Sequence, residues 1–119
     1  MQLASIEAIS KHTDIILLSP TGSGKTLAFL IPVLESLEAG NNKVQSLVLT
    51  PSRELALQIE QVFKSMNTGF KSSCCYGGHK MSVEKNNLTE PPAILIGTPG
   101  RVLDHITRGN FNTANIHTL

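Results

Sequence analysis

Residues 19–26 read Ser-Pro-Thr-Gly-Ser-Gly-Lys-Thr, a glycine-containing loop that ends in a lysine and a threonine. Glycines let a chain turn so that successive backbone N–H groups point at one spot and can bind an anion. A helix that begins at the end of such a loop adds free N–H groups and the positive end of its dipole. Lys25 would bring a full charge to the β- and γ-phosphates of a nucleotide, and the Thr26 hydroxyl would bind its Mg²⁺ ion. The loop therefore predicts a phosphate-binding site.

One position departs from the strict phosphate-loop pattern G-x-x-x-x-G-K-S/T, because residue 19 is serine where the pattern has glycine. The context nevertheless fits the pattern, since the apolar residues 15–18 precede the loop and an apolar stretch of helical character, residues 27–37, follows it. The alternative is a Gly/Ser loop that only caps a helix. The Lys-Thr pair between a strand and a helix favours nucleotide binding over that alternative.

The elements that would position this loop alternate between strands and helices. Apolar runs predict strands at residues 14–18 and 46–50, and further strands are predicted at residues 71–76 and 93–96. Longer stretches bounded by turn residues predict helices at residues 3–9, 25–39, 53–66, 80–88 and 101–107, with a turn at 97–100 and a loop at 109–119. This order predicts an α/β fold with a parallel sheet and helices on both faces. Ligands of such sheets bind beyond the carboxyl ends of the strands, where the loops 19–24, 51–54 and 97–101 are expected to meet.

Composition limits the classes of protein that fit. The chain has 119 residues, 40% of them hydrophobic, which suits one globular domain, and a net charge of +1 gives no basic field for nucleic acid. No apolar run reaches about 18 residues, so we expect no membrane span. Cys74 and Cys75 are sequence neighbours, and with His79 they do not make a zinc cage. Two free thiols in a reducing cytosol are the better interpretation, which predicts a cytoplasmic location.

Three further segments occur in an order that is typical of one family. Pro51-Ser52-Arg53-Glu54-Leu55-Ala56 is similar to helicase motif Ia, P-T-R-E-L-A, with serine for threonine. Gly77-Gly78 is similar to the GG doublet, and Thr98-Pro99-Gly100-Arg101 to motif Ib. With residues 19–26 as motif I, whose family form A-x-T-G-S-G-K-T also lacks the first glycine, the chain resembles the first part of the N-terminal RecA-like domain of DEAD-box ATP-dependent RNA helicases. The resemblance covers essentially the whole chain.

The resemblance implies a RecA-like phosphate-loop NTPase with ATP and Mg²⁺ as its cofactors. Gln2 lies 23 residues before Lys25, the spacing of the Q-motif glutamine, which in the family reads the adenine edge. The ATP-binding residues implied are Gln2, Thr21, Gly22, Ser23, Gly24, Lys25 and Thr26, with Lys25 and Thr26 catalytic and Thr26 at the metal. The RNA-binding residues implied are Pro51, Ser52, Arg53, Glu54, Gly77, Gly78, Thr98, Pro99, Gly100 and Arg101.

Physical reasons support these RNA-binding segments independently of the family. Arg53 and Glu54 fall in the first turn of a predicted helix, where free N–H groups can bind a phosphate oxygen. Thr98 and Arg101 flank a Pro-Gly turn and offer a hydroxyl and a charge. Such groups address the sugar-phosphate backbone, so binding independent of RNA sequence is expected. A plain capped helix at 51–56 and a turn with one solvated arginine at 98–101 remain the alternatives.

The family's Asp-Glu-Ala-Asp segment, motif II, does not occur in this sequence. We therefore expect residues 1–119 to form an incomplete N-terminal RecA-like domain, inactive alone, whose parent chain supplies motif II and a second RecA-like domain. Unpaired backbone at the missing strand would favour self-association. Another phosphate-loop NTPase such as a small kinase, a DNA helicase, and a non-catalytic RNA or protein interaction module remain open as alternatives.

Overall fold

The structure is a computed structural model that describes residues 25–78 and 80–119, without the side chains of residues 25–27. It divides into two compact units, residues 1–36 and 37–119, and each is described by itself. The predicted helix 3–9, strand 14–18 and loop 19–24 lie outside the described residues, as does His79. Gln2, Thr21, Gly22, Ser23 and Gly24 lie outside them too, so their assignments stay predictions.

The described part of the first unit is one helix, α2, Lys25–Ser36. It begins where the phosphate-loop pattern requires a helix to begin, as predicted. It ends three residues before the predicted end at residue 39. Pro32 lies inside it. In the last turn, the Ser36 hydroxyl donates a hydrogen bond of 2.6 Å to the carbonyl oxygen of Val33.

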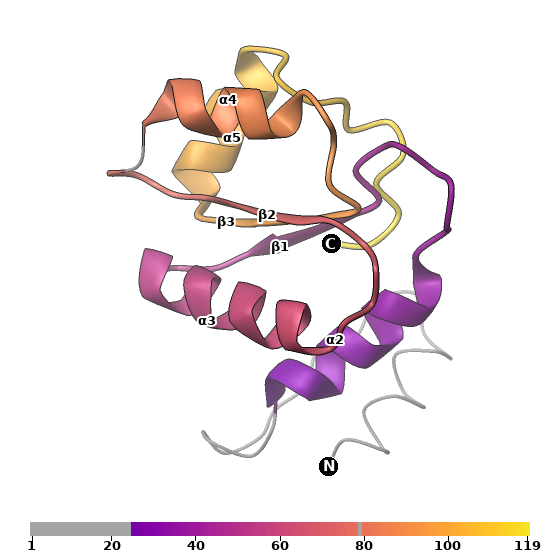
Figure 1. Cartoon of the computed structure of the whole chain (residues 1–119). Coiled ribbons are helices and arrows are strands. Elements are labelled where there is room, and N and C mark those ends of the chain that lie inside the picture. The colour runs from indigo at the N-terminus through magenta and orange to yellow at the C-terminus, as the bar shows by residue number, and fades with distance from the viewer. Residues whose placement is uncertain (1–24, 79) are drawn as a thin grey trace. The chain divides into compact units, whose positions relative to one another are not determined.

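The second unit is built on a three-stranded sheet (Figure 1). Its strands are β1, Ser46–Leu49, β2, Ser72–Cys75, and β3, Ile94–Gly97. All pairs are parallel, and the order is β1-β3-β2. The central strand β3 is buried along its whole length, which explains its unbroken apolar sequence. The predicted parallel sheet is confirmed for these three strands, with no strand end more than one residue from its predicted position.

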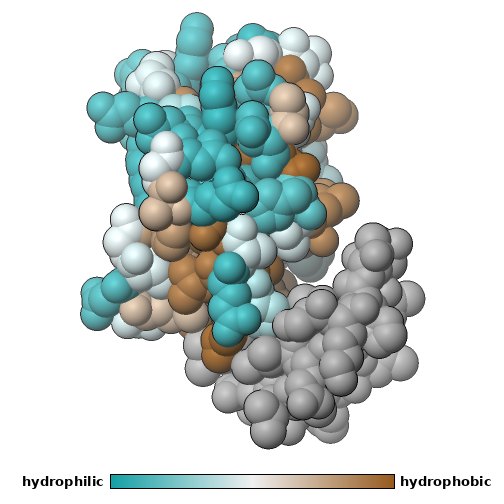
Figure 2. Space-filling view, turned by 90° about the vertical axis from the view of Figure 1, so that its right-hand side faces the viewer, coloured by the Kyte–Doolittle hydropathy of each residue, from teal (hydrophilic) through white to brown (hydrophobic). Residues whose placement is uncertain are grey.

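Helices cover both faces of this sheet, as predicted (Figure 1). Helix α3, Arg53–Ser65, lies on one face, while α4, Met81–Leu88, and α5, Pro99–Thr107, lie on the other. Helix α3 buries Ala56, Ile59 and Phe63, one stripe of a 3.6-residue period. On the side of the molecule shown in Figure 2, the upper part of the surface is mostly hydrophilic. Helices α4 and α5 bury Leu88 and Val102, while Val83, Leu103 and Ile106 stay exposed.

The start of α5 corrects the sequence-based prediction of a turn at 97–100. The helix begins at Pro99, two residues earlier than predicted, and Thr98 is its extended N-cap residue, with φ −84° and ψ 147°. Proline suits the first helical position because its fixed φ is already helical and its missing N–H would have no partner there. Pro99 and Gly100 thus belong to the first turn of a helix, so the main-chain N–H groups around them point out of its N-terminus.

The core between the sheet and the helices α4 and α5 is one apolar cluster. Its buried members are Val44, Leu47, Cys75, Leu88, Leu95, Val102 and Phe111, and the partly buried Ile116 packs against it. Among the helices of residues 25–78 and 80–119, none is long and apolar enough to cross a membrane.

Residues 109–119 form the expected loop for most of their length, but their end pairs with the sheet. Thr118 makes a parallel bridge with Ser46. The Leu47 N–H donates to the Thr118 carbonyl oxygen at 3.0 Å, and the His117 N–H donates to that of Gln45 at 3.0 Å. The tail therefore lies along the edge of β1 that β3 does not use.

Candidate nucleic-acid interface

The three segments that resemble RNA-binding motifs meet at one edge of the sheet. Each follows a strand of the same parallel sheet, so the strand ends lie side by side (Figure 1). Main-chain hydrogen bonds join these ends. The Thr50 N–H donates to the Gly97 carbonyl oxygen at 2.9 Å, and the Thr98 N–H donates to the Cys75 carbonyl oxygen at 3.1 Å. The structure thus brings together residues 51–54 and 98–101, as the order of elements predicted, and places residues 77–78 beside them.

The first segment opens helix α3 with an N-cap. Ser52 is extended, and its hydroxyl accepts a hydrogen bond from the Leu55 N–H at 3.3 Å. The Thr50 hydroxyl donates to the Ser52 carbonyl oxygen at 2.9 Å, which fixes the turn into the helix. Arg53 and Glu54 occupy the first turn and are exposed. Because helix geometry leaves the N–H groups of a first turn without intrahelical partners, this end can bind an anion.

Arg53 connects this segment to the glycine doublet. A Cβ on Gly78 would lie 3.3 Å from the Arg53 Nη1 atom, and the φ of Gly78 is +90°, a conformation that favours glycine. The Arg53 Nε atom is 3.2 Å from a carboxylate oxygen of Glu54, in an exposed pair. A hydrogen bond from its own backbone, and then the Arg53 guanidinium, hold the pKa of the Glu54 carboxyl below its usual value. Glu54 is therefore charged, so its N–H, and not its side chain, suits a phosphate.

The third segment opens helix α5. The side chain of Thr98 makes no cap hydrogen bond, while its carbonyl oxygen accepts from the Val102 N–H at 3.0 Å. Pro99 and Gly100 are exposed. A Cβ placed on Gly100 would meet nothing within 4 Å, so the space in front of this turn is open. Open space therefore borders the first turn of α5 at Gly100, and helix geometry leaves the N–H groups of that turn without intrahelical partners.

The side chain of Arg101 is held by an acidic residue that the sequence analysis did not single out. The Arg101 Nε atom lies 2.7 Å from Oε1 of Glu84, and the Arg101 side chain is only 15% exposed. Oε1 also lies 2.8 Å from Nε2 of the buried His105. The amide of Asn110 donates to His105 Nδ1 at 2.9 Å, so Nε2 carries the proton that the carboxylate accepts. The interpretation of Arg101 as a solvated arginine is therefore wrong.

Cys75, Glu84 and His105 also have the composition of a metal site. Their ligand atoms lie within 4.8 Å of one another, and all three residues are buried. Burial, and then the charge of Glu84, raise the pKa of the Cys75 thiol to about 12, so it keeps its proton. Oε1 of Glu84 and Nε2 of His105 are already hydrogen-bonded to each other, and Arg101 supplies a positive charge to the carboxylate. Glu84, His105 and Arg101 therefore form a hydrogen-bonded network, and the Cys75 thiol lies beside it.

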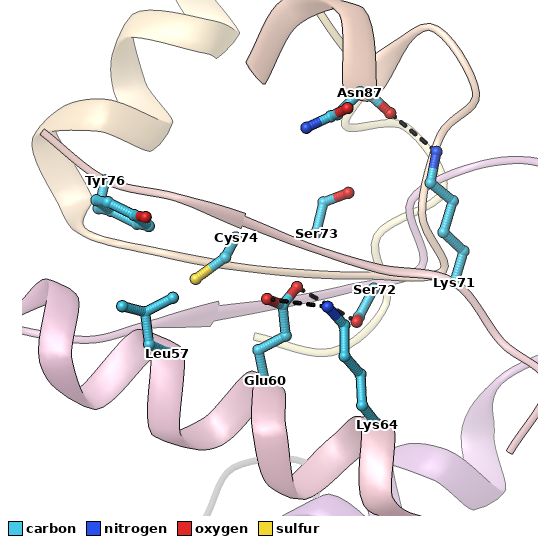
Figure 3. A pocket seen from close by; sticks show the side chains of 9 residues that line it. All are labelled: Leu57, Glu60, Lys64, Lys71, Ser72, Ser73, Cys74, Tyr76 and Asn87. Carbon is cyan, nitrogen blue, oxygen red and sulfur yellow. Dashed lines mark hydrogen bonds and ion pairs between the residues drawn. The ribbon is translucent and has the colours of Figure 1, made fainter. Parts of the chain in front are cut away.

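An open pocket of about 310 Å³ lies elsewhere, along the outer edge of β2 between α3 and α4 (Figure 3). The two lysines of its lining already have partners. Lys64 pairs with Glu60 at 3.5 Å, and Lys71 donates to the carbonyl oxygens of Asn87 and Glu90, at 2.9 and 2.5 Å. The lining includes no residue of the first turn of α3 or of α5.

A parallel α/β sheet with anion-binding helix ends at the carboxyl edge of its strands defines a class of nucleotide- and nucleic-acid-binding proteins. The sequence profile of the DEAD/DEAH box helicase family matches residues 1–119, and the chain belongs to that family. The resemblance inferred from the motifs is therefore confirmed.

Individual relatives agree with this assignment. The ATP-dependent RNA helicase DeaD of Buchnera aphidicola subsp. Baizongia pistaciae is 38% identical over 122 residues, covering 100% of this chain and 20% of that protein. The ATP-dependent rRNA helicase RRP3 of Candida albicans is 44% identical over 123 residues, with 100% and 23% coverage. The chain thus spans roughly a fifth of the length of these relatives.

Solved structures show the same fold. The crystal structure of a DEAD box protein from the hyperthermophile Methanococcus jannaschii superposes with a TM-score of 0.87 at 36% identity, over 97% of this chain and 32% of that one. A hypothetical ATP-dependent RNA helicase from Sulfolobus tokodaii gives a TM-score of 0.82 at 30% identity, over 97% and 33%. The predicted RecA-like α/β class is therefore confirmed.

Proposed function

We propose that this chain is the first part of the N-terminal, ATP-binding RecA-like domain of an ATP-dependent RNA helicase. The observation that carries the proposal is the meeting of residues 51–54, 77–78 and 98–101 at the carboxyl ends of three parallel strands. Membership of the DEAD/DEAH box family supports it, as do relatives that are named RNA helicases.

The ATP site in this proposal is the loop 19–26 with Gln2. Helix α2 begins at Lys25, so the first N–H groups of a helix stand at the end of the loop, where phosphates need them. Lys25 would neutralise the β- and γ-phosphates, and Thr26 would bind Mg²⁺, which bridges the phosphates in this chemistry. Thr21, Gly22, Ser23 and Gly24 would surround the phosphates, and Gln2 would read the adenine edge.

The RNA site is the edge formed by the three segments described above. The first turns of α3 and α5 offer N–H groups, and Gly77 and Gly78 allow close approach of the RNA backbone. Because these groups contact phosphates and sugars, one strand of RNA would be held regardless of its sequence. The net charge of +1 agrees with a site built from a few placed groups.

The partners of this domain follow from the same proposal. Hydrolysis also requires an acidic residue that holds the metal, which the Asp-Glu-Ala-Asp motif provides in the family. We propose that it and a second RecA-like domain belong to the parent chain, and that ATP closes the two domains on RNA and opens short duplexes. The bridge between Thr118 and Ser46 supports a further parallel strand beside β1. The cytoplasmic location stays a prediction, consistent with the two free cysteines.

Replacing Lys25 tests the ATP site directly. Lys25→Ala in the full-length protein should weaken ATP binding and reduce RNA-stimulated hydrolysis at least about a hundredfold, because the phosphates lose their principal charge. Phosphate release at saturating RNA measures the effect. The control is Lys43→Ala, which removes an exposed lysine outside the loop.

Two outcomes would contradict the proposal. An unchanged rate in Lys25→Ala would rule out the phosphate-loop assignment. Stimulation of the wild-type protein by single-stranded DNA and not by RNA would favour the DNA helicase alternative.

A further inference from the structure

We propose that Glu84 is a positioning residue that fixes the glycine-doublet loop and the start of helix α5 to one another, so that both present their N–H groups to the same RNA strand. The inference rests on the proposed function and assigns a role to a residue outside the three motifs.

The carboxylate of Glu84 joins two segments that are distant in sequence. Its Oε2 atom accepts a hydrogen bond from the main-chain N–H of Tyr76 at 3.0 Å, immediately before the glycine doublet. Its Oε1 atom accepts from Arg101 at 2.7 Å and from His105 at 2.8 Å, both on helix α5. Glu84 itself belongs to α4, so a single side chain connects the loop after β2 to the motif Ib helix.

Burial makes this connection rigid. The side chain of Glu84 is fully buried, and that of His105 is too, while Arg101 is 15% exposed. A carboxylate removed from water is tolerated only with a cationic partner and with its oxygens hydrogen-bonded, and Glu84 has both. Asn110 orients the His105 ring from the far side. Each donor therefore has a fixed direction in a low-dielectric surrounding.

Stability alone does not explain a buried carboxylate here. Well-packed apolar side chains of similar volume generally stabilise a core as well as a buried ion pair does. Hydrogen bonds from Tyr76 and Arg101 add direction and distance, which apolar contacts do not specify. The network therefore suits a place where the relative position of two loops matters more than the free energy of folding.

The relative position of the glycine-doublet loop and helix α5 matters for binding RNA. Consecutive phosphates on one strand have a separation set by the sugar-phosphate backbone, so two protein sites bind them together only at a matching separation. A link that holds the glycine-doublet loop against α5 before RNA arrives lowers the cost of ordering them on binding. The link also sets the direction of the Arg101 guanidinium, whose Nε is engaged by Glu84.

Glu84→Gln in the full-length protein tests this role. Glutamine keeps the shape of the side chain, but it replaces one acceptor oxygen with an NH₂ group, which donates. In one orientation this NH₂ group faces the N–H of Tyr76, and in the other it faces the donors of α5, so one hydrogen bond is lost either way. The RNA concentration for half-saturation should rise about tenfold, with the binding stoichiometry unchanged. If Glu84 had a role in stability alone, the variant would contain a smaller fraction of protein competent to bind RNA, but the RNA concentration for half-saturation would not change. The amide proton resonance of Tyr76 should move in the variant.

Glu90→Gln is the matched control, because Glu90 has an exposed side chain just after α4. If Glu84→Gln does not fold, Arg101→Lys keeps the positive charge but removes the Nε donor, and it should raise half-saturation similarly. If folded Glu84→Gln, or Arg101→Lys, reached half-saturation at the same RNA concentration as the wild-type protein, the inference would be overturned. Wild-type protein that fails to bind RNA at all would overturn the proposed function instead.

Discussion

The neighbouring cysteines, Cys74 and Cys75, lie on opposite faces of strand β2, and the pKa of both thiols is raised. Cys75 is buried against the core, and Cys74 is half-buried in the pocket between α3 and α4 (Figure 3). Burial raises the pKa of both thiols to about 12, with Glu60 adding to the effect at Cys74 and Glu84 at Cys75. Protonated thiols are poor nucleophiles and poor metal ligands, which argues for a packing role.

A dependence on pH follows from these raised pKa values. The folded state binds the thiol protons more tightly than the unfolded chain, whose thiols titrate near 9. This contribution to stability is complete below about pH 8 and is lost as the pH rises toward 12. At pH 8, an aromatic disulfide reagent should react much more slowly with the folded chain than with the chain in denaturant, which should react at both cysteines. Equal rates in the two states would contradict the assignment.

At the scale of elements, Gly97 sets how closely strand β2 and helix α5 approach. A Cβ on Gly97 would lie 2.6 Å from the Cys75 carbonyl oxygen and 2.7 Å from Cγ2 of Val102. Backbone and a core side chain have little room to move, so Gly97→Ala should lower the free energy of unfolding by about 1–3 kcal/mol. Urea unfolding measures the change. Gly100→Ala is the control, since a Cβ there meets nothing within 4 Å, and equal stability of both variants would refute the argument.

The same elements show what sequence patterns can predict. Apolar runs located β1 and β3 to within one residue, because buried parallel strands need such runs. Strand β2, whose burial alternates, contains no such run. The start of α5 was predicted too late because the Pro-Gly pair was interpreted as a turn, although proline suits the first position of a helix. The carboxyl ends of parallel strands always share one edge, so the meeting of the three motifs was predictable.

The role of Glu84 was not predictable from sequence. A glutamate in a short polar helix normally faces water, and its partners Arg101 and His105 lie 17 and 21 residues further along the chain. Only tertiary packing brings them together. The similarity to motif Ib identified Arg101 as a candidate, but the sequence could not show that its Nε atom binds a buried carboxylate.

At the scale of the unit formed by residues 37–119, the edges of the sheet bear on the self-association expected from the sequence. Unpaired strand edges invite pairing with another chain. Strand β1 has β3 on one side and the tail at Thr118 on the other. The tail is held by two main-chain hydrogen bonds and by Ile116, which packs on the apolar core. At the β1 edge, the self-association expected from the sequence therefore depends on how firmly this tail stays in place.

Removing the apolar anchor of the tail tests this dependence. Ile116→Asp should release the tail, because a charge cannot stay against the cluster of Leu47 and Phe111. The Leu47 N–H, which donates to Thr118 at 3.0 Å, should then exchange with solvent about tenfold faster, and the average mass in solution should rise with concentration. Leu119→Asp is the matched control, since that side chain is 85% exposed in the same tail. Exchange at Leu47 that is as slow in Ile116→Asp as in Leu119→Asp would show that the tail does not protect β1.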